Sequence, residues 1–442
     1  MKIQLSDHFT YKKLLDFTLP SVAMMLFTSI YGMVDGFFVS NFVGKTPFTA
    51  VNLIFPFLFI LGAFGAMLGT GGSALIAKTL GEGDRDKANR LFSLFVYLSL
   101  GVGVVLAILA SIFIRPIASM LGAEGETLEN CVIYGRIILL ALPSLLLQFG
   151  FQSFFVTAER PGLGFLVTVA SGVTNIVFDA LLVAIFPLGI VGAAIATAMS
   201  QVVGGIVPLF YFFSKNSSLL RLGKTRFDGG ALIQACLNGS SEFLTNIALS
   251  LVSMLYNVQL LHYAGEDGVA AYGVLMYVGF IFVSMFIGYS IGTAPIVGYN
   301  YGAKRQDELK NILRKSFWVI GITSVAMVVS SLLLAYPFSY LYVGYDKALL
   351  DMTLRAFLIY SFSFLFTGIS IYLSSFFTAL NNGPVSAAIS FIRTLFLQIL
   401  AVLLLPLILG IDGIWLATVL SDGVAAIVSL LFLLFNRKKY GY

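Results

Sequence analysis

Long apolar runs recur along the whole chain, and they constrain its fold more than any other feature. Runs of about 18 or more apolar residues can cross roughly 30 Å of hydrocarbon as helices. They are too continuous for the alternating strands of a membrane β-barrel. Only 11% of the 442 residues are charged, against roughly 25% in an average soluble domain. The pattern predicts an all-α polytopic membrane protein.

Glycine, proline and charged residues divide these runs into twelve predicted transmembrane spans. The first six are 15–40, 48–77, 91–114, 131–157, 163–186 and 189–213. The last six are 231–261, 269–300, 316–335, 353–379, 385–409 and 413–435. A basic segment, 214–230, separates the two sets and is predicted to be a cytoplasmic linker. We therefore expect an N-terminal lobe over 1–213 and a C-terminal lobe over 231–442.

The basic residues fall mostly on one side of these spans. If the N-terminus is cytoplasmic, 20 of the 26 basic residues, from Lys2 to Lys439, lie in inner loops and tails, 5 lie on the outer side, and Arg393 stands inside a span. The positive-inside rule then places both termini in the cytoplasm, and we expect the plasma membrane, the inner one in a prokaryote. The charges are spread over short loops, which disfavours a nucleic-acid-binding face.

An internal repeat appears when the second half is moved back by 221 residues. The segment GTGGSALIAKTLGEGDRDK (69–87) then meets SIGTAPIVGYNYGAKRQDE (290–308), and GIVGAAIATAMS (189–200) meets GIDGIWLATVLS (410–421). Six spans per half give both halves the same orientation, as parallel repeats related by a pseudo-twofold axis along the membrane normal. This plan is associated with transporters whose binding site lies between the halves.

Few ionisable residues stand inside the predicted spans, and each costs about 2.5 to 3.5 kcal/mol to bury near the bilayer centre. Asn175 and Asp179 are four residues apart, on one face of a helix. Thr197 stands in the next span, and Asp35 stands in the first. If these helices adjoin, their oxygens could bind a small hard cation such as Na+, or one of the two carboxylates could hold a proton. The alternative is an ordinary interhelical hydrogen bond, worth about 0.6 kcal/mol; two aspartates in one half favour ion binding.

Weaker predictions concern the second half. Glu242 could contact a cationic substrate, or it could be hydrated near the inner end of its helix. Arg393 could pair with an acid or extend to the membrane interface. Tyr256, Met276 and Tyr277 are candidates to line a substrate cavity, although aromatic and methionine side chains more often face lipid or the core.

No cofactor, metal site beyond Na+, or enzyme activity is predicted. Two cysteines, Cys131 and Cys236, and two histidines lie far apart, so their spacing gives neither a zinc site nor a disulfide framework. The segment GTGGSALIAKTLGEG lacks the Gly-Lys pair and the preceding strand of a phosphate-binding loop. Asp422 aligns with Gln201 in the repeat, which indicates a packing role.

Several motifs, in their order and spacing, resemble the multidrug and toxic compound extrusion (MATE) family over almost the full length. They are LPSVAMMLFTSIYGMVDGFFVSNFVG (19–44), LGEGDRDKANR (80–90), NIVFDALL (175–182), LGIVGAAIATAMS (188–200) and GYNYGAKR (298–305). In the branch with the prokaryotic damage-inducible-type exporters, the resemblance implies an ion or proton site in the first lobe. Its pattern is matched by Asp35, Asn175, Asp179 and Thr197. Pro20 matches a proline about which the first helix is proposed to bend.

The resemblance also implies a function. We expect a secondary antiporter that exports amphipathic, often cationic organic compounds in exchange for Na+ or H+, and that works as a monomer surrounded by lipid. Glu242 resembles one acid of a second-lobe cation site found in another branch, but the tenth span has no acid to complete it. The alternative function is a flippase for a lipid-linked saccharide. The single intramembrane cation, Arg393, disfavours it because such carriers need basic side chains for pyrophosphate.

Overall fold

The computed structural model describes residues 3–442, without the side chains of Ser40 and Lys45. Lys2, counted above among the inner basic residues, lies outside this range. All regular elements of the described range are helices, and eleven of them are long and apolar enough to cross a membrane. The prediction of an all-α polytopic membrane protein is confirmed.

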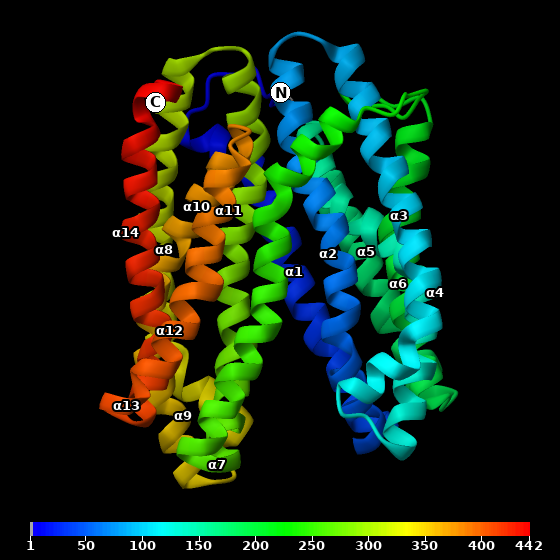
Figure 1. Ribbon diagram of the computed structural model, residues 1–442, viewed down its shortest axis with the longest axis vertical. Helices are drawn as coiled ribbons and strands as arrows, with labels where there is room; N and C mark the ends of the chain where they lie inside the picture. Colours follow the sequence, from blue (N-terminus) through cyan, green and yellow to red (C-terminus); the bar gives the residue numbers. More distant parts are fainter. Residues whose placement is uncertain (1–2) are drawn as a thin grey trace.

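The first lobe consists of α1 to α6, with α2 to α6 on the right of Figure 1. Its helices are α1 (Tyr11–Phe38), α2 (Lys45–Gly81), α3 (Arg85–Met120), α4 (Gly125–Thr157), α5 (Pro161–Asp179) and α6 (Gly189–Phe213). Short π-helical segments extend α1 and α5, at Val39–Val43 and Ala180–Ile185. With these π-helical segments included, the bounds contain the spans predicted for the first half, except that the fifth span, 163–186, extends one residue past the end of its helix at Ile185.

The second lobe consists of α7 to α14, with α8 to α14 on the left of Figure 1. Its helices are α7 (Gly229–Gly302), α8 (Gln306–Val343), α9 (Lys347–Tyr360), α10 (Phe364–Ala379), α11 (Gly383–Phe391), α12 (Leu397–Leu404), α13 (Pro406–Leu409) and α14 (Ile411–Tyr440). A 3₁₀ turn joins α9 to α10, and a π-helical segment, Ile392–Phe396, joins α11 to α12.

The 74 residues of α7 account for two of the predicted spans, because the chain reverses within this element at Gly265. Gly265 has φ +66°, a conformation that glycine adopts at no steric cost. The rings of Tyr256 and Tyr272 stack with centroids 5.1 Å apart, whereas sixteen residues of straight helix would separate them by about 24 Å. The element is therefore a helical hairpin, and its two arms correspond to spans 231–261 and 269–300.

The two lobes meet at the end of the molecule where both termini lie (Figure 1). A Cβ atom built on Gly71 of α2 would lie 1.9 Å from the carbonyl oxygen of Ala235, and one built on Gly81 would lie 2.0 Å from that of Tyr299. Glycine at these positions lets the backbones of α2 and α7 touch. Gly292 of α7 is packed in the same way against α1.

Each lobe is preceded by a segment that packs on the opposite lobe. In the N-terminal segment, residues 3–10, the Phe9 amide donates to Oε1 of Glu308 on α8 at 2.9 Å. In the linker, the Arg221 amide donates to Oδ1 of Asn89 on α3 at 2.9 Å. Because α3 and α8 occupy equivalent places in the repeat, the two segments exchange partners across the pseudo-twofold axis.

Candidate functional site

The structure brings the polar residues predicted for the first lobe together, from α1, α5 and α6. Nδ2 of Asn175 donates to Oδ1 of Asp35 at 3.2 Å. Oγ1 of Thr197 donates to the same carboxylate oxygen, also at 3.2 Å. Asn175 and Asp179 are both buried, as expected for residues that share the inner face of α5. We call these four residues the acidic cluster.

Asp179 adds a second carboxylate to the acidic cluster. It is an electrostatic neighbour of Asp35. Both of its carboxylate oxygens, and Oδ1 of Asn175, are buried and have no hydrogen-bond partner among the described residues. A buried carboxylate without a donor is costly unless a positive charge or a proton compensates it. The cluster thus offers oxygen atoms, the ligands that hard cations prefer, at a place where a cation or proton would lower the free energy.

A glycine explains why α1 and α5 can approach each other at this cluster. A Cβ atom built on Gly172, one turn before Asn175, would lie 2.5 Å from the ring of Phe27 and 2.9 Å from the ring of Tyr31. The absence of a side chain at this position lets the rings of α1 lie against the backbone of α5. The carboxylate of Asp35, one turn further along α1, then comes within hydrogen-bonding distance of Asn175.

Residues that the sequence did not single out surround the acidic cluster. Tyr134 of α4 is buried beside Thr197 and Asp35, and Tyr31 of α1 also lies near Asp35. Gln148 continues the polar contacts away from the carboxylates, because its Nε2 donates to Oγ of Ser171 at 3.2 Å. A single tyrosine or glutamine in an apolar helix gives no periodic signal that would distinguish it from a packing residue.

Glu242 and Arg393 line one polar cavity of about 70 Å³ in the contact region between the lobes. Hydroxyl groups from both lobes complete its lining, among them Thr70 and Ser153 of the first lobe and Ser290 of the second. Within the described residues Arg393 forms no ion pair with an acid closer than 4 Å. The cavity has room only for small ligands such as water, since pockets for drug-sized ligands measure about 300 to 1,000 Å³.

The other candidates lie apart from this cavity. Tyr256 is buried and its hydroxyl donates to Oε1 of Gln398 at 2.7 Å. The side chain of Tyr277, on α7, is half exposed on the surface of the protein. Met276 packs against the core of the second lobe. Pro20 lies inside α1, which is one continuous helix from Tyr11 to Phe38. Its role as a bending point stays a prediction.

The comparison with known families agrees with this architecture. The family model described as MatE matches residues 20–181 and again residues 243–404. The chain belongs to the MatE family. The model matches once in each lobe, which agrees with the internal repeat. Because MatE proteins are transporters, this chain is a membrane transporter and not an enzyme.

Relatives with assigned names and solved structures extend over nearly the same length. The chain is 24% identical to the multidrug export protein MepA of Staphylococcus aureus strain MRSA252 over 433 residues, which are 97% of this chain and 94% of that protein. It is 28% identical over 364 residues to MepA of Staphylococcus haemolyticus strain JCSC1435, covering 81% of this chain and 80% of that protein. A structure described as the outward-facing conformation of a multidrug resistance MATE family transporter aligns with a TM-score of 0.92 at 24% identity, covering 98% of this chain and 97% of that chain. The MatE fold is thus shared over nearly the whole chain.

Proposed function

We propose that this MatE protein is a multidrug efflux antiporter of the plasma membrane, which exports amphipathic, often cationic organic compounds in exchange for Na+ or H+. The observation that carries the proposal is the acidic cluster, where the buried carboxylate of Asp179 lies beside the partly buried carboxylate of Asp35. No N–H or hydroxyl group of the described residues donates to the oxygens of Asp179. The names of the MepA relatives support multidrug export. We further propose that the chain acts as a monomer.

The position of the cluster on α1 suggests how ion binding is coupled to the lobes. Asp35 lies near one end of α1, and Thr18 lies near the other end. There Thr18 packs closely on α7, because a Cβ atom built on Gly292 would lie 2.9 Å from the Cβ atom of Thr18. A cation or proton at Asp35 changes how α1 binds to α5 and α6, and the same helix carries that change to the lobe contact. Antiport follows if ion and substrate favour different lobe arrangements by a few kcal/mol.

The charge distribution gives this mechanism a direction. With the termini in the cytoplasm, the lobes are closed on the inner side and the acidic cluster lies toward the outer side. The ion would then bind from the outer side and promote release of the exported compound there. Its binding would also favour the arrangement of the lobes that opens to the cytoplasm. Substrate that binds from the cytoplasm would favour the return.

Proteoliposomes test this proposal directly. Ethidium, a cationic aromatic dye, is followed while a Na+ gradient or a pH gradient is imposed separately. Export driven by one of the two gradients is the expected result, and it identifies the ion. Export that proceeds at equal rate without either gradient would overturn antiport.

Resistance assays in cells add a residue-level test. Asp35→Asn and Asp179→Asn each remove a carboxylate at nearly constant volume and should abolish drug resistance at normal expression. The matched control is Asp422→Asn, a buried acid of the second lobe whose contact with Thr367 an amide can still make. If both first-lobe variants confer full resistance, the acidic cluster has no role in coupling.

A further inference from the structure

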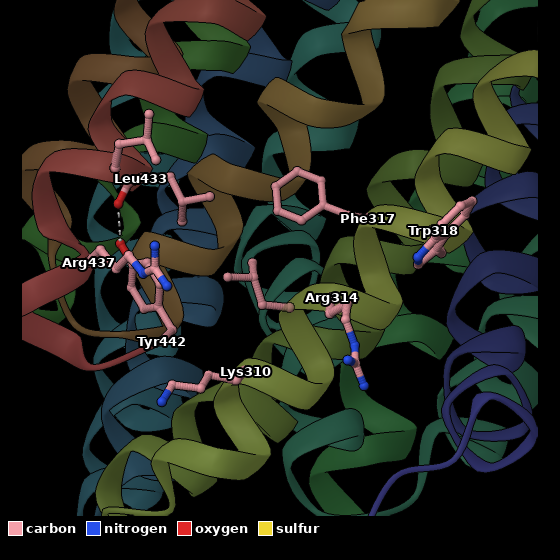
Figure 2. A pocket seen from close by; sticks show the side chains of 9 residues that line it. Lys310, Arg314, Phe317, Trp318, Leu433, Arg437 and Tyr442 are labelled. Carbon is pink, nitrogen blue, oxygen red and sulfur yellow. Dashed lines mark hydrogen bonds between the residues drawn. The ribbon is translucent and has the colours of Figure 1, made fainter.

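A groove of about 640 Å³ lies between α8 and α14, at the end of the molecule that carries the termini. Figure 2 shows the side chains that line it. This groove belongs to the second lobe alone, and it has no residue in common with the acidic cluster or with the cavity of Glu242. We call it the α8–α14 groove.

Three cationic side chains lie at one end of the α8–α14 groove. Lys310 and Arg314 are one turn apart on α8, and Arg437 faces them from the last turns of α14. In the part of the chain that the structure describes, none of the three forms an ion pair, and no acidic side chain lines the groove. Three uncompensated positive charges around one concave surface favour an anionic ligand.

Apolar side chains line the rest of the groove. Phe317 and Trp318 follow Arg314 along α8, about 5 to 6 Å further along the helix axis. Leu434 lies at the matching depth on α14, one turn before Arg437. Figure 2 shows Lys310 and Arg314 toward one end of the groove and Phe317 toward the other. Trp318 is 63% exposed and Leu434 is 62% exposed, so the apolar part is open to the surroundings of the protein.

This order of charge and apolar surface matches a membrane interface. Tryptophan is enriched where the headgroups meet the hydrocarbon, and basic clusters beside transmembrane helices bind acidic lipid headgroups. The two arginines present forked donors that suit phosphate oxygens. A free phosphate would use the cationic end only and would leave the apolar surface without a role.

We propose that the α8–α14 groove binds an anionic phospholipid, with its phosphate between Lys310, Arg314 and Arg437. The acyl chains lie along Trp318 and Leu434. The last residues already fold back at this place, because the hydroxyl of Tyr442 donates to the carbonyl oxygen of Leu433 at 2.9 Å. A bound lipid joins this end of α14 to α8. The proposal does not depend on which ion or drug is transported.

Native mass spectrometry of the full-length protein tests the site. Purified protein is exchanged into detergent that contains equal amounts of phosphatidylglycerol and phosphatidylcholine, and the bound lipid is counted. The groove variant is K310Q/R314Q/R437Q. The matched control is K12Q/K215Q/K438Q, which removes the same charge from exposed positions at the same end of the molecule.

The wild type should retain one phosphatidylglycerol in preference to phosphatidylcholine. Each lost cation should weaken binding about five-fold, so the groove variant should lose roughly a hundred-fold in affinity while the control binds as the wild type does. Trp318→Ala leaves the charge unchanged and should still reduce retention. Since Trp318 is mostly exposed, this variant tests the site even if the triple groove variant fails to fold.

Three outcomes would overturn the proposal. The first is equal retention of the two lipids by the wild type. The second is an equal loss in the groove variant and the control, which would indicate diffuse attraction to the basic end. The third is inorganic phosphate raising the melting temperature as much as phosphatidylglycerol does, because that result would indicate a site for a free anion.

Discussion

The two lobes share one plan of helices but differ in chemistry at equivalent positions. Tyr256 follows Asp35 by 221 residues, and Thr418 follows Thr197 by the same interval. The hydroxyl of Tyr256 donates to Gln398 at 2.7 Å and lies 3.0 Å from Oγ1 of Thr418. In both lobes, therefore, a side chain of the first helix is hydrogen-bonded to an amide and to a threonine.

The difference lies in the charge of the central group. In the second lobe a neutral phenol is the donor, and Tyr256, Gln398 and Thr418 have no buried polar atom without a partner. In the first lobe a carboxylate accepts, and no donor among the described residues reaches the neighbouring oxygens of Asp179. The comparison teaches that the same helix packing can enclose either a neutral hydrogen-bond network or a charged one. One copy is complete by itself, and the other is the copy to which we assign the coupling ion in the proposed function.

The largest expected effect comes from removing the charge in the first lobe. The double substitution D35N/D179N should abolish binding of the coupling ion, because no carboxylate remains in the acidic cluster. Isothermal titration with Na+ and measurement of proton release upon dye binding would detect this loss. Tyr256→Phe, the corresponding change in the second lobe, should bind the ion as the wild type does. Equal loss in both variants would contradict a division of roles between the lobes.

The next effect concerns the two exchanged segments. Glu308 receives hydrogen bonds from the Phe9 amide at 2.9 Å and from Nδ2 of Asn311 at 2.8 Å, and Nδ1 of His8 lies 2.7 Å away. Glu308→Ala should lower the free energy of unfolding by about 2 to 3 kcal/mol, since hydrogen bonds to a charged group are lost. Thermal unfolding in detergent measures it.

Asn89→Ala, which removes the acceptor for Arg221 in the linker, is the comparison for Glu308→Ala. It should cost less, because a neutral amide is replaced at an exposed contact. If Asn89→Ala is less stable than Glu308→Ala, the contact of the N-terminal segment with α8 does not contribute more to stability than the contact of the linker with α3.

Close contact between the lobes gives a third prediction. Gly71→Ala places a Cβ atom 1.9 Å from a backbone oxygen of α7, so it should destabilise this arrangement by about 1 to 3 kcal/mol through overpacking. Cysteine cross-linking across the lobe contact would report the shift toward the opposite arrangement. Gly101→Ala, where an added Cβ meets nothing within 4 Å, is the control and should leave the cross-linking yield unchanged.

The smallest effect is expected for the neutral network itself. Tyr256→Phe removes the donor to Gln398 and leaves that amide oxygen buried, which should cost about 1 kcal/mol. Thermal unfolding would show the loss, while ion-driven export in proteoliposomes should continue. Loss of export without loss of stability would assign a transport role to the second-lobe network and break the comparison.

Much of the fold could be predicted because its signals are local in the sequence. The twelve spans follow from the length of the apolar runs, which reflects the thickness of hydrocarbon that each helix must cross. The acidic cluster could be predicted because a carboxylate in such a run is rare and costly, and because Asn175 and Asp179 are one helical turn apart. The repeat also indicated that the two lobes would share one plan.

Contacts between distant segments required the tertiary structure. No local pattern shows that residues 3–10 pack on α8, that Tyr134 lies beside Thr197, or that Lys310 and Arg437 line one groove. These pairs depend on how helices from different parts of the chain are placed. In the sequence, each of these residues looks no different from a residue that is merely exposed or packed. The sequence by itself determined the helices, the repeat and the acidic residues, since burial in hydrocarbon selects residue types one position at a time. Only the tertiary structure decided that, among the residues it describes, one network is left with unpaired carboxylate oxygens and the other is complete, because hydrogen-bond partners are supplied by neighbouring helices.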